Sequence, residues 1–239
     1  MKIKGRPLDF SQFSIVTFDC YGTLVDWEAG IVAALQPVLQ SHGLKRSDDR
    51  VLELYGEMEP RAQTGEFLPY ADVLRRVMDA VADRLGFELI AGERDALVDS
   101  IGDWPVFADT PAALRSLKRR YHLWVLSNID DSLFARTSPR LGVELDGVVT
   151  AEQLRSYKPS PAHFTKLLER TGTNPHRVLH VAQSLYHDIA PASSLGFATV
   201  WVNRRADRPG GGATPASAAR PDLEVHDLAT LARAIEQQD

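Results

Sequence analysis

Residues 14–24 read SIVTFDCYGTL, an apolar, β-branched run that reaches Asp19 and is followed by Gly22. Such a run predicts a buried strand, because strands covered on both faces are hydrophobic along their whole length. The glycine predicts a tight turn directly after the strand. Further short apolar runs predict four more strands, at residues 123–128, 147–150, 178–184 and 198–203.

Helical patterns lie between these strands. Asp109, Thr110 and Pro111 form a typical helix start, with a capping side chain and then proline in the first turn. Alternating strands and helices predict a parallel sheet with helices on both faces, which is a Rossmann-like α/β core. Other helices of this core are expected at residues 161–171, 189–195 and 228–237.

The stretch from about residue 47 to 100 shows no strand pattern. Apolar residues at helical spacing predict helices there, after a first helix from Trp27 to about His42. A helical block between two stretches of α/β pattern is typical of an inserted cap. We therefore expect an α/β core of residues 1–26 and 103–239 and a helical cap of residues 27–102.

Composition limits the classes of function. Hydrophobic residues make up 44% of the chain and charged residues 25%, as in ordinary globular proteins. The net charge is −5 with Lys and Arg spread along the chain, which argues against nucleic acid or an anionic membrane as a partner. A single cysteine, Cys20, excludes an intrachain disulfide and a cysteine-based zinc site.

No stretch approaches the ~18 apolar residues of a membrane span, and the first residues lack the apolar core of a signal peptide. We therefore expect a soluble protein of the cytoplasm that has no membrane partner. The Gly-, Pro- and Ala-rich residues 208–221 predict a mobile surface loop.

Polar residues close the predicted strands. In parallel α/β sheets, ligands bind beyond the carboxyl ends of the strands. Each such residue alone is more often a turn or cap residue than a functional one. Their joint occurrence at successive strand ends favours a site that handles an anion with a carboxylate nucleophile. They are Asp19 after the first strand, Ser127 and Asn128 at the second, Lys158 after the third and Asp188 after the fourth.

Asp19 is the natural nucleophile of such a site, because carboxylates form covalent ester intermediates. Lys158 would keep Asp19 ionised through its opposite charge, and Asp188 would orient Lys158. Gly22 and Thr23 follow in the turn, where we expect their backbone N–H groups to stabilise charge on the attacked carboxyl group.

Four motifs at these positions carry a family resemblance. They are FDCYGTL at residues 18–24, LSN at 126–128, SYKP at 156–159 and VAQSLYHDIAPA at 181–192. In order and spacing they resemble the haloacid dehalogenase superfamily over nearly the whole chain, including a helical cap between the first two motifs. The resemblance implies the fold of that superfamily. The catalytic residues that it implies are Asp19, Thr23, Ser127, Asn128, Lys158 and Asp188.

Two positions distinguish the branches of the superfamily. Its phosphatases have Asp where this chain has Tyr21 and Gln183, and they use these residues to protonate the leaving group and to hold Mg²⁺. The two replacements disfavour phosphoryl transfer. The Asp-x-Tyr-Gly-Thr pattern resembles the L-2-haloacid dehalogenases instead. It implies attack of Asp19 on the halogen-bearing carbon of a short 2-haloacid and hydrolysis of the resulting ester, with no metal and no other cofactor.

The pocket departs from those dehalogenases and leaves a second reaction open. Arg61 is the nearest replacement for the cap arginine of the family, and we expect it to hold the substrate carboxylate. SLYHD at residues 184–188 and DWE at 26–28 look similar to hydrolases that open a strained carbon–nitrogen ring beside a carboxylate, as in azetidine-2-carboxylate. In that reaction His187 or Tyr186 would supply the proton for the departing amine.

The expected partner is a small-molecule carboxylate. A homodimer is also open, because dimers are common in the family. A Mg²⁺-dependent phosphatase and a catalytically silent binding protein are less favoured alternatives. The residues expected to bind the substrate are Tyr21, Trp27, Arg61, Ser184, Tyr186 and His187.

Overall fold

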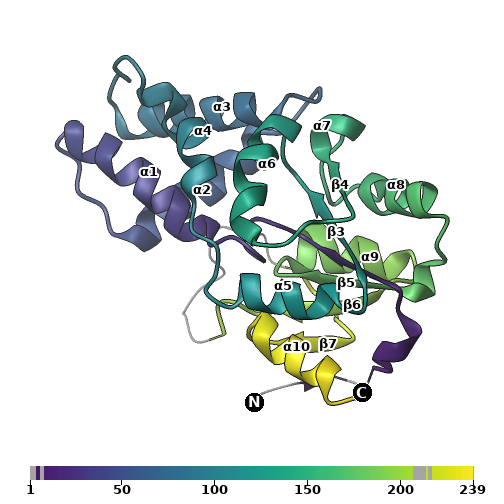
Figure 1. Ribbon diagram of the computed structural model, residues 1–239. Coiled ribbons are helices and arrows are strands. Elements are labelled where there is room, and N and C mark those ends of the chain that lie inside the picture. Colours follow the sequence, from purple (N-terminus) through teal and green to yellow (C-terminus); the bar gives the residue numbers. More distant parts are fainter. Residues whose placement is uncertain (1–3, 6–7, 207–213, 215–216, 239) are drawn as a thin grey trace.

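A computed structural model of the chain describes residues 4–5, 8–206, 214 and 217–238, and within these residues seven strands form one sheet (Figure 1). The strand order is β1-β7-β6-β5-β2-β3-β4. Neighbouring strands are parallel, except that β1 and β7 are antiparallel. The strands are β1 (Lys4–Gly5), β2 (Ile15–Phe18), β3 (His122–Ser127), β4 (Gly147–Thr150), β5 (Val178–Ala182), β6 (Ala198–Val202) and β7 (Leu223–Val225).

The parallel α/β core expected from the sequence is confirmed, and the five predicted strands are β2 to β6. The strands β1 and β7 were not expected. They have two and three residues, which is too short for a hydrophobic period to show. Of the loop expected at residues 208–221, residues 208–213, 215 and 216 lie outside the described part of the chain.

The register of β2 brings several strand ends to one edge of the sheet. Phe18 in β2 pairs with Val125 in β3 and with Val181 in β5. Because these strands run parallel and in step, the residues that follow them leave the sheet at the same edge. Both faces of β2 are covered, since Val16 and Ile15 belong to two different hydrophobic clusters.

Helices α1 to α4 lie between β2 and β3 in the sequence and contact one another at one end of the molecule (Figure 1). We propose that they form the cap expected at residues 27–102. The other helices accompany the sheet. The helices are α1 (Trp27–Ser41), α2 (Asp48–Ala62), α3 (Tyr70–Leu85), α4 (Ala96–Ser100), α5 (Thr110–Lys118), α6 (Asp131–Thr137), α7 (Ala151–Leu154), α8 (Ala162–Thr171), α9 (Ala190–Ser194) and α10 (Leu228–Glu236).

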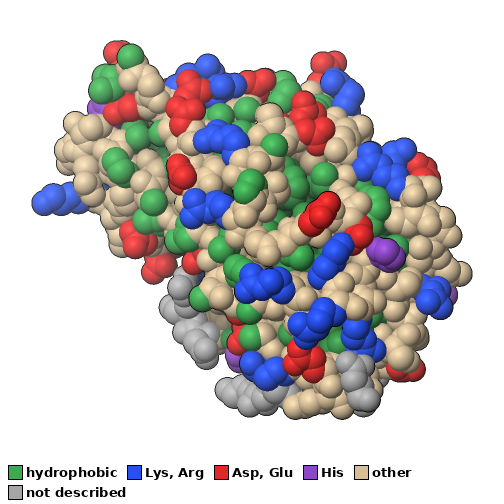
Figure 2. Space-filling view, viewed as in Figure 1, with side chains coloured by type: hydrophobic (Ala, Val, Ile, Leu, Met, Phe, Trp, Pro, Cys, Tyr) green, Lys and Arg blue, Asp and Glu red, His purple; other side chains and the backbone are tan. Residues whose placement is uncertain are grey.

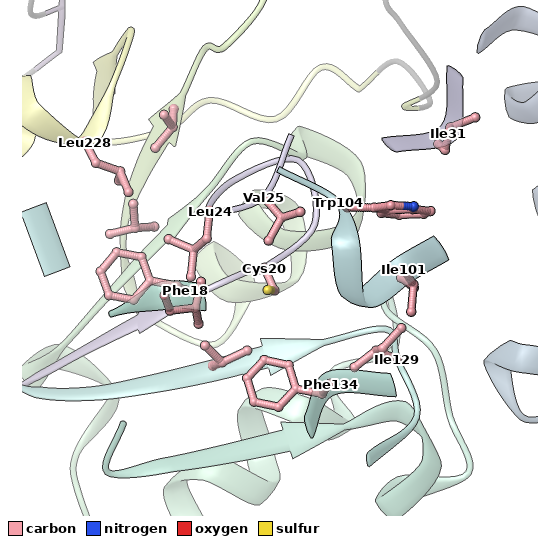
Figure 3. Close-up of a cluster of buried hydrophobic side chains, with 14 of the residues drawn as sticks. Phe18, Cys20, Leu24, Val25, Ile31, Ile101, Trp104, Ile129, Phe134 and Leu228 are labelled. Carbon is pink, nitrogen blue, oxygen red and sulfur yellow. The ribbon is translucent and has the colours of Figure 1, made fainter. Parts of the chain in front are cut away.

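The turn after β2 is fixed by a buried hydrophobic cluster (Figure 3). Cys20 and Leu24 are fully buried in it, and burial raises the pKa of the Cys20 thiol well above its usual value. Trp104, which follows the helical group, packs into the same cluster. A Cβ atom on Gly30 would lie 2.2 Å from Trp104 Cγ, so the glycine lets α1 approach that ring. The cluster therefore joins the turn to the helical group.

Charged side chains of both signs are dispersed over the face shown in Figure 2. Among the described large hydrophobic side chains, Ile90 and Tyr186 are exposed. None of the helices in the described part of the chain combines the length and the apolar character needed to cross a membrane.

Candidate active site

Lys158 is buried between two carboxylates at the carboxyl edge of the sheet. Its Nζ lies 2.9 Å from Asp19 Oδ1, 2.6 Å from Asp188 Oδ1 and 2.8 Å from the carbonyl oxygen of Leu126. An ammonium group has three hydrogens, so these three acceptors use all of them. The side chains of Lys158 and Asp188 are each 1% exposed. Their charges are therefore compensated by each other rather than by water.

Asn128 and His180 hold this ion cluster in place. Asn128 Oδ1 accepts from the backbone N–H of Lys158 at 2.7 Å, and Asn128 Nδ2 donates to the Lys158 carbonyl oxygen at 3.1 Å. His180 in β5 has Nε2 3.1 Å from Asp188 Oδ1 and Nδ1 2.8 Å from Thr17 Oγ1. The motifs do not point to His180. Its one signal is its position as a polar residue inside an apolar strand.

Asp19 follows β2 and is held by Thr23. Asp19 Oδ2 accepts a 2.8 Å hydrogen bond from Thr23 Oγ1, which in turn accepts from the backbone N–H of Gln183 at 2.9 Å. The role expected for the N–H groups of Gly22 and Thr23 does not fit this geometry, because both donate to carbonyl oxygens within the turn. The Thr23 hydroxyl, rather than the turn backbone, therefore contacts the Asp19 carboxylate.

The two carboxylates differ in their titration. Burial alone would raise the pKa of Asp188, but the Lys158 ammonium and the His180 hydrogen bond lower that pKa to about 2. Burial raises the pKa of Asp19, and Lys158 opposes this rise without cancelling it. Burial would lower the pKa of Lys158, yet the two carboxylates raise it. Asp188 is therefore the firmer partner of Lys158, and Asp19 is the more basic carboxylate, as suits a nucleophile.

A cavity of about 60 Å³ opens beside Asp19. Because ~10–15 Å³ is enough for one water molecule, this volume accommodates a substrate of a few non-hydrogen atoms. Side chains of the sheet edge and of the helical group line it together. The sheet edge contributes Asp19, Ser127, Asn128, Lys158 and Asp188, and the helices contribute Trp27, Glu59 and Tyr70.

Four of the expected substrate residues line the cavity: Tyr21, Trp27, Ser184 and His187. Tyr21 offers its ring, because its hydroxyl is hydrogen-bonded to Thr137 Oγ1 at 2.8 Å. Ser184 Oγ accepts from the backbone N–H of His187 at 2.9 Å, at the start of a single π-helical turn. Burial lowers the pKa of His187 to about 4, so its imidazole is neutral near pH 7.

The structure does not bring Arg61 and Tyr186 to the cavity. Tyr186 is 40% exposed, and Arg61 is exposed near the end of α2. Glu59, two residues before Arg61, lines the cavity. Side chains two positions apart on a helix differ by about 200° in direction, so one points inward when the other points outward. This geometry does not support Arg61 as the clamp for a substrate carboxylate.

Glu59 and Tyr70 are cavity residues that the motifs do not reveal. Glu59 lies four residues after the fully buried Tyr55, so the helical period was the signal that places both on one face of α2. Tyr70 begins α3, and its backbone N–H donates to Asp130 Oδ1 at 2.6 Å, while that of Ala71 donates to Oδ2 at 2.8 Å. Asp130, from the loop after β3, therefore caps α3 and anchors it to the sheet edge.

The donor atoms of this site do not suit a divalent cation. The Lys158 ammonium already lies between Asp19 and Asp188. Gln183, a neutral side chain, accepts a 3.2 Å hydrogen bond from Thr214 Oγ1. Within the described residues, no group of three or more His, Cys, Asp and Glu side chains is arranged to hold a metal ion. The residues present therefore do not fit a Mg²⁺ site.

The fold and this site define a hydrolase with a parallel α/β core. The haloacid dehalogenase-like hydrolase family matches residues 13–196, and the chain belongs to that family. It is 27% identical over 198 residues to (S)-2-haloacid dehalogenase 4A of Burkholderia cepacia, covering 80% of this chain and 84% of the relative.

The fold is shared with solved structures of L-2-haloacid dehalogenases. A defluorinating L-2-haloacid dehalogenase superposes with a TM-score of 0.80 at 23% identity, covering 94% of this chain and 95% of its own. The L-2-haloacid dehalogenase of Xanthobacter autotrophicus with chloropropionic acid covalently bound superposes with a TM-score of 0.76 at 19% identity, covering 94% and 98%.

Proposed function

We propose that the protein hydrolyses the carbon–halogen bond of short 2-haloacids through an ester on Asp19, without a metal ion. One observation carries the proposal: Asp19 opens into a small cavity and shares a buried Lys158 with Asp188. The family membership and the (S)-2-haloacid dehalogenase of Burkholderia cepacia support the same chemistry. The chloropropionic acid bound covalently to the Xanthobacter enzyme supports a covalent intermediate.

In the first step, an Asp19 carboxylate oxygen attacks the carbon that carries the halogen. A carbon–oxygen bond forms, the carbon–halogen bond breaks, and its electron pair leaves with the halide. Lys158 and Thr23 hold the carboxylate in one orientation, at 2.9 Å and 2.8 Å. Because that orientation is set before the substrate arrives, little ordering remains for the reaction itself.

In the second step, water attacks the carboxyl carbon of the Asp19 ester. Negative charge then develops on the carboxyl oxygen, where the donors of Lys158 and Thr23 can stabilise it. One proton of the water ends on the hydroxyl group of the product and the other is released. The neutral His187 lines the cavity and can accept that proton, whereas the pKa of Asp188 is lowered to about 2 and makes it a poor base.

The alternatives fit the geometry less well. A Mg²⁺-dependent phosphatase would need carboxylates where this cavity has the neutral Gln183 and Tyr21. Opening of a carbon–nitrogen ring needs a proton for the amine, and neither candidate expected from the sequence supplies it. Tyr186 lies outside the cavity, and His187 is neutral near pH 7. A halide can leave without a proton, whereas an amine would need one from a further cavity residue such as Glu59. The (S)-2-haloacid dehalogenase relative therefore favours carbon–halogen cleavage.

The test is a single-turnover reaction in heavy-oxygen water with 2-chloropropionate and a chelator. Water attacks the ester at the carboxyl group, so we expect the label in Asp19 by mass spectrometry of the digested protein. Label that enters only the hydroxy acid would mean direct attack of water on the substrate. Phosphate release from an aryl phosphate with Mg²⁺, or consumption of azetidine-2-carboxylate without halide release, would favour one of the alternatives.

A further inference from the structure

A departing halide develops negative charge, and the cavity offers few cations to stabilise it. Among the described residues that line the cavity, Lys158 is the one Lys or Arg side chain, and all three of its ammonium hydrogens are used. The imidazole of His187 is neutral near pH 7. Arg61, the expected cation of the helical side, is exposed on the outer face of α2. The halide therefore has to be stabilised by neutral hydrogen-bond donors of the lining, which include Trp27, Ser127 and a protonated Glu59.

Glu59 presents a carboxyl group to this cavity in a network of neutral groups. Its Oε1 accepts a hydrogen bond from Gln63 Nε2 and a long one, 3.4 Å, from the Tyr70 hydroxyl. The Tyr70 hydroxyl is 2.8 Å from the hydroxyl of Tyr55. Both of these hydrogen bonds end on Oε1, so Oε2 is the oxygen left to carry a proton.

The surroundings keep a large fraction of Glu59 protonated up to about pH 7. Burial raises the pKa of this carboxyl to about 7, opposed by the Tyr70 hydrogen bond. Tyr55 on α2, Tyr70 on α3 and Tyr157, next to Lys158, all face it, and burial raises the pKa of each phenol. Across the cavity lie the ion cluster of Asp19, Lys158 and Asp188, and the neutral His187.

We propose that Glu59 is the leaving-group residue of this site, a neutral carboxylic acid that donates a hydrogen bond from Oε2 to the departing halide. The proposal rests on the carbon–halogen cleavage proposed above. The halide leaves with the electron pair of its bond to carbon, and the proton stays on Glu59. The ionised form of Glu59 would repel the halide, so the same residue makes leaving-group departure sensitive to pH.

The direction of the pH effect follows from the protonated fraction. As the pH rises through about 7, Glu59 loses its proton and the hydrogen bond to the halide is lost. Asp19 has to be ionised and so produces a loss of activity on the acid side instead. Among the described groups of the cavity, Glu59 is therefore the carboxyl whose ionisation above about pH 7 is expected to lower activity.

The kinetic test measures kcat/KM for halide release from 2-chloropropionate between pH 5 and 9. In the unmodified protein we expect a fall above pH 7 that approaches about tenfold per pH unit, as for titration of one group. Glu59→Gln keeps a permanent N–H donor, so its profile is expected to be flat there. Glu57→Gln, the same change at an exposed position of α2, is the matched control and is expected to keep the fall. A fall that persists in Glu59→Gln would overturn the proposal.

A binding test decides the assignment even when no haloacid is turned over. Sodium bromide is titrated against the thermal unfolding temperature at pH 6 and pH 8, because a ligand of the folded state raises it. We expect bromide to stabilise the unmodified protein and Glu57→Gln more at pH 6 than at pH 8, and Glu59→Gln equally at both. Equal stabilisation of all three at both pH values would overturn the role of Glu59. If bromide stabilises the protein as expected but no halide is released from haloacids, the proposed carbon–halogen cleavage fails and the halide-binding role of Glu59 stands.

Discussion

The two sides of the cavity are built in different ways. On the sheet side, Asp19, Lys158 and Asp188 form a buried ion cluster in which each charge has a partner within 3 Å. On the helical side, the Tyr70 phenol is neutral and Glu59 titrates with a pKa of about 7, and the hydrogen bond between them is 3.4 Å long. Replacing one residue of the ion cluster would leave an unpaired buried charge, whereas the helical side has no such ion pair to break. We infer that the strand ends supply the nucleophile, whereas the helical side surrounds the leaving group.

The largest effect is expected on the sheet side, from Asp19→Asn. The variant lacks the nucleophile, so we expect halide release to fall by at least about 10⁴-fold. The amide is nearly the same size as the carboxylate and still accepts from Thr23, so the fold is expected to persist. Halide release is measured together with the circular dichroism spectrum. Mass spectrometry is used to exclude deamidation of the new Asn to Asp. If the variant is still active, Asp19 is not the nucleophile.

Lys158→Met tests the ion cluster itself. Two buried carboxylates would then face each other without a cation, and we expect a loss of about 3–5 kcal/mol in the free energy of unfolding at pH 7. In the unmodified protein the pKa of Asp188 is lowered to about 2, so its stabilisation is present above pH 4 and lost as the pH falls through about 2. In the variant the pKa values of both carboxyls rise, and stability is instead lost as the pH increases.

Urea unfolding at pH 5 and pH 7 tests this pH dependence of the free energy of unfolding. The deficit of Lys158→Met is expected to be smaller at pH 5 than at pH 7, because protonation relieves the repulsion between Asp19 and Asp188. Lys166→Met, at an exposed pair with Glu169 on α8, is the control and should change stability by less than about 1 kcal/mol at either pH. An equal deficit at both pH values would mean that Lys158 acts through packing rather than charge.

The same contrast explains what the sequence could predict. The strand ends follow directly from the chain, since parallel register places Asp19, Asn128 and Asp188 at one edge wherever the strands form. The helical side depends on helix phase. Arg61 and Glu59 point about 200° apart around the axis of α2, so the prediction of Arg61 chose the wrong face of the helix. The four-residue spacing from Tyr55 to Glu59 indicates the correct face. The hydrogen bonds of the turn after Asp19 have no such signal, because they depend on backbone angles that a motif does not specify.

A moderate effect is expected where the two sides meet, at Asp130. Its carboxylate caps α3 through the N–H groups of Tyr70 and Ala71. Asp130→Ala is expected to lower the free energy of unfolding by about 1–2 kcal/mol and to raise KM more than it lowers kcat, because Tyr70 loses its position. Ser47→Ala removes the cap of α2, away from the cavity, and should lower stability without changing KM. An unchanged KM in Asp130→Ala would mean that Asp130 caps α3 but does not position Tyr70 for substrate binding.

The smallest effect is expected within the helical side, from Tyr70→Phe. The hydrogen bond from the Tyr70 hydroxyl favours the ionised form of Glu59, so its removal is expected to raise the pKa of that carboxyl further. The fall in halide release above pH 7 should therefore move to higher pH, by less than about one unit because the 3.4 Å bond is long. Tyr55→Phe leaves the contact between Tyr70 and Glu59 in place and is expected to shift the profile less. A shift toward lower pH in Tyr70→Phe would mean that this hydroxyl accepts the proton of Glu59, and the two residues would then act on the halide as a relay rather than as one donor.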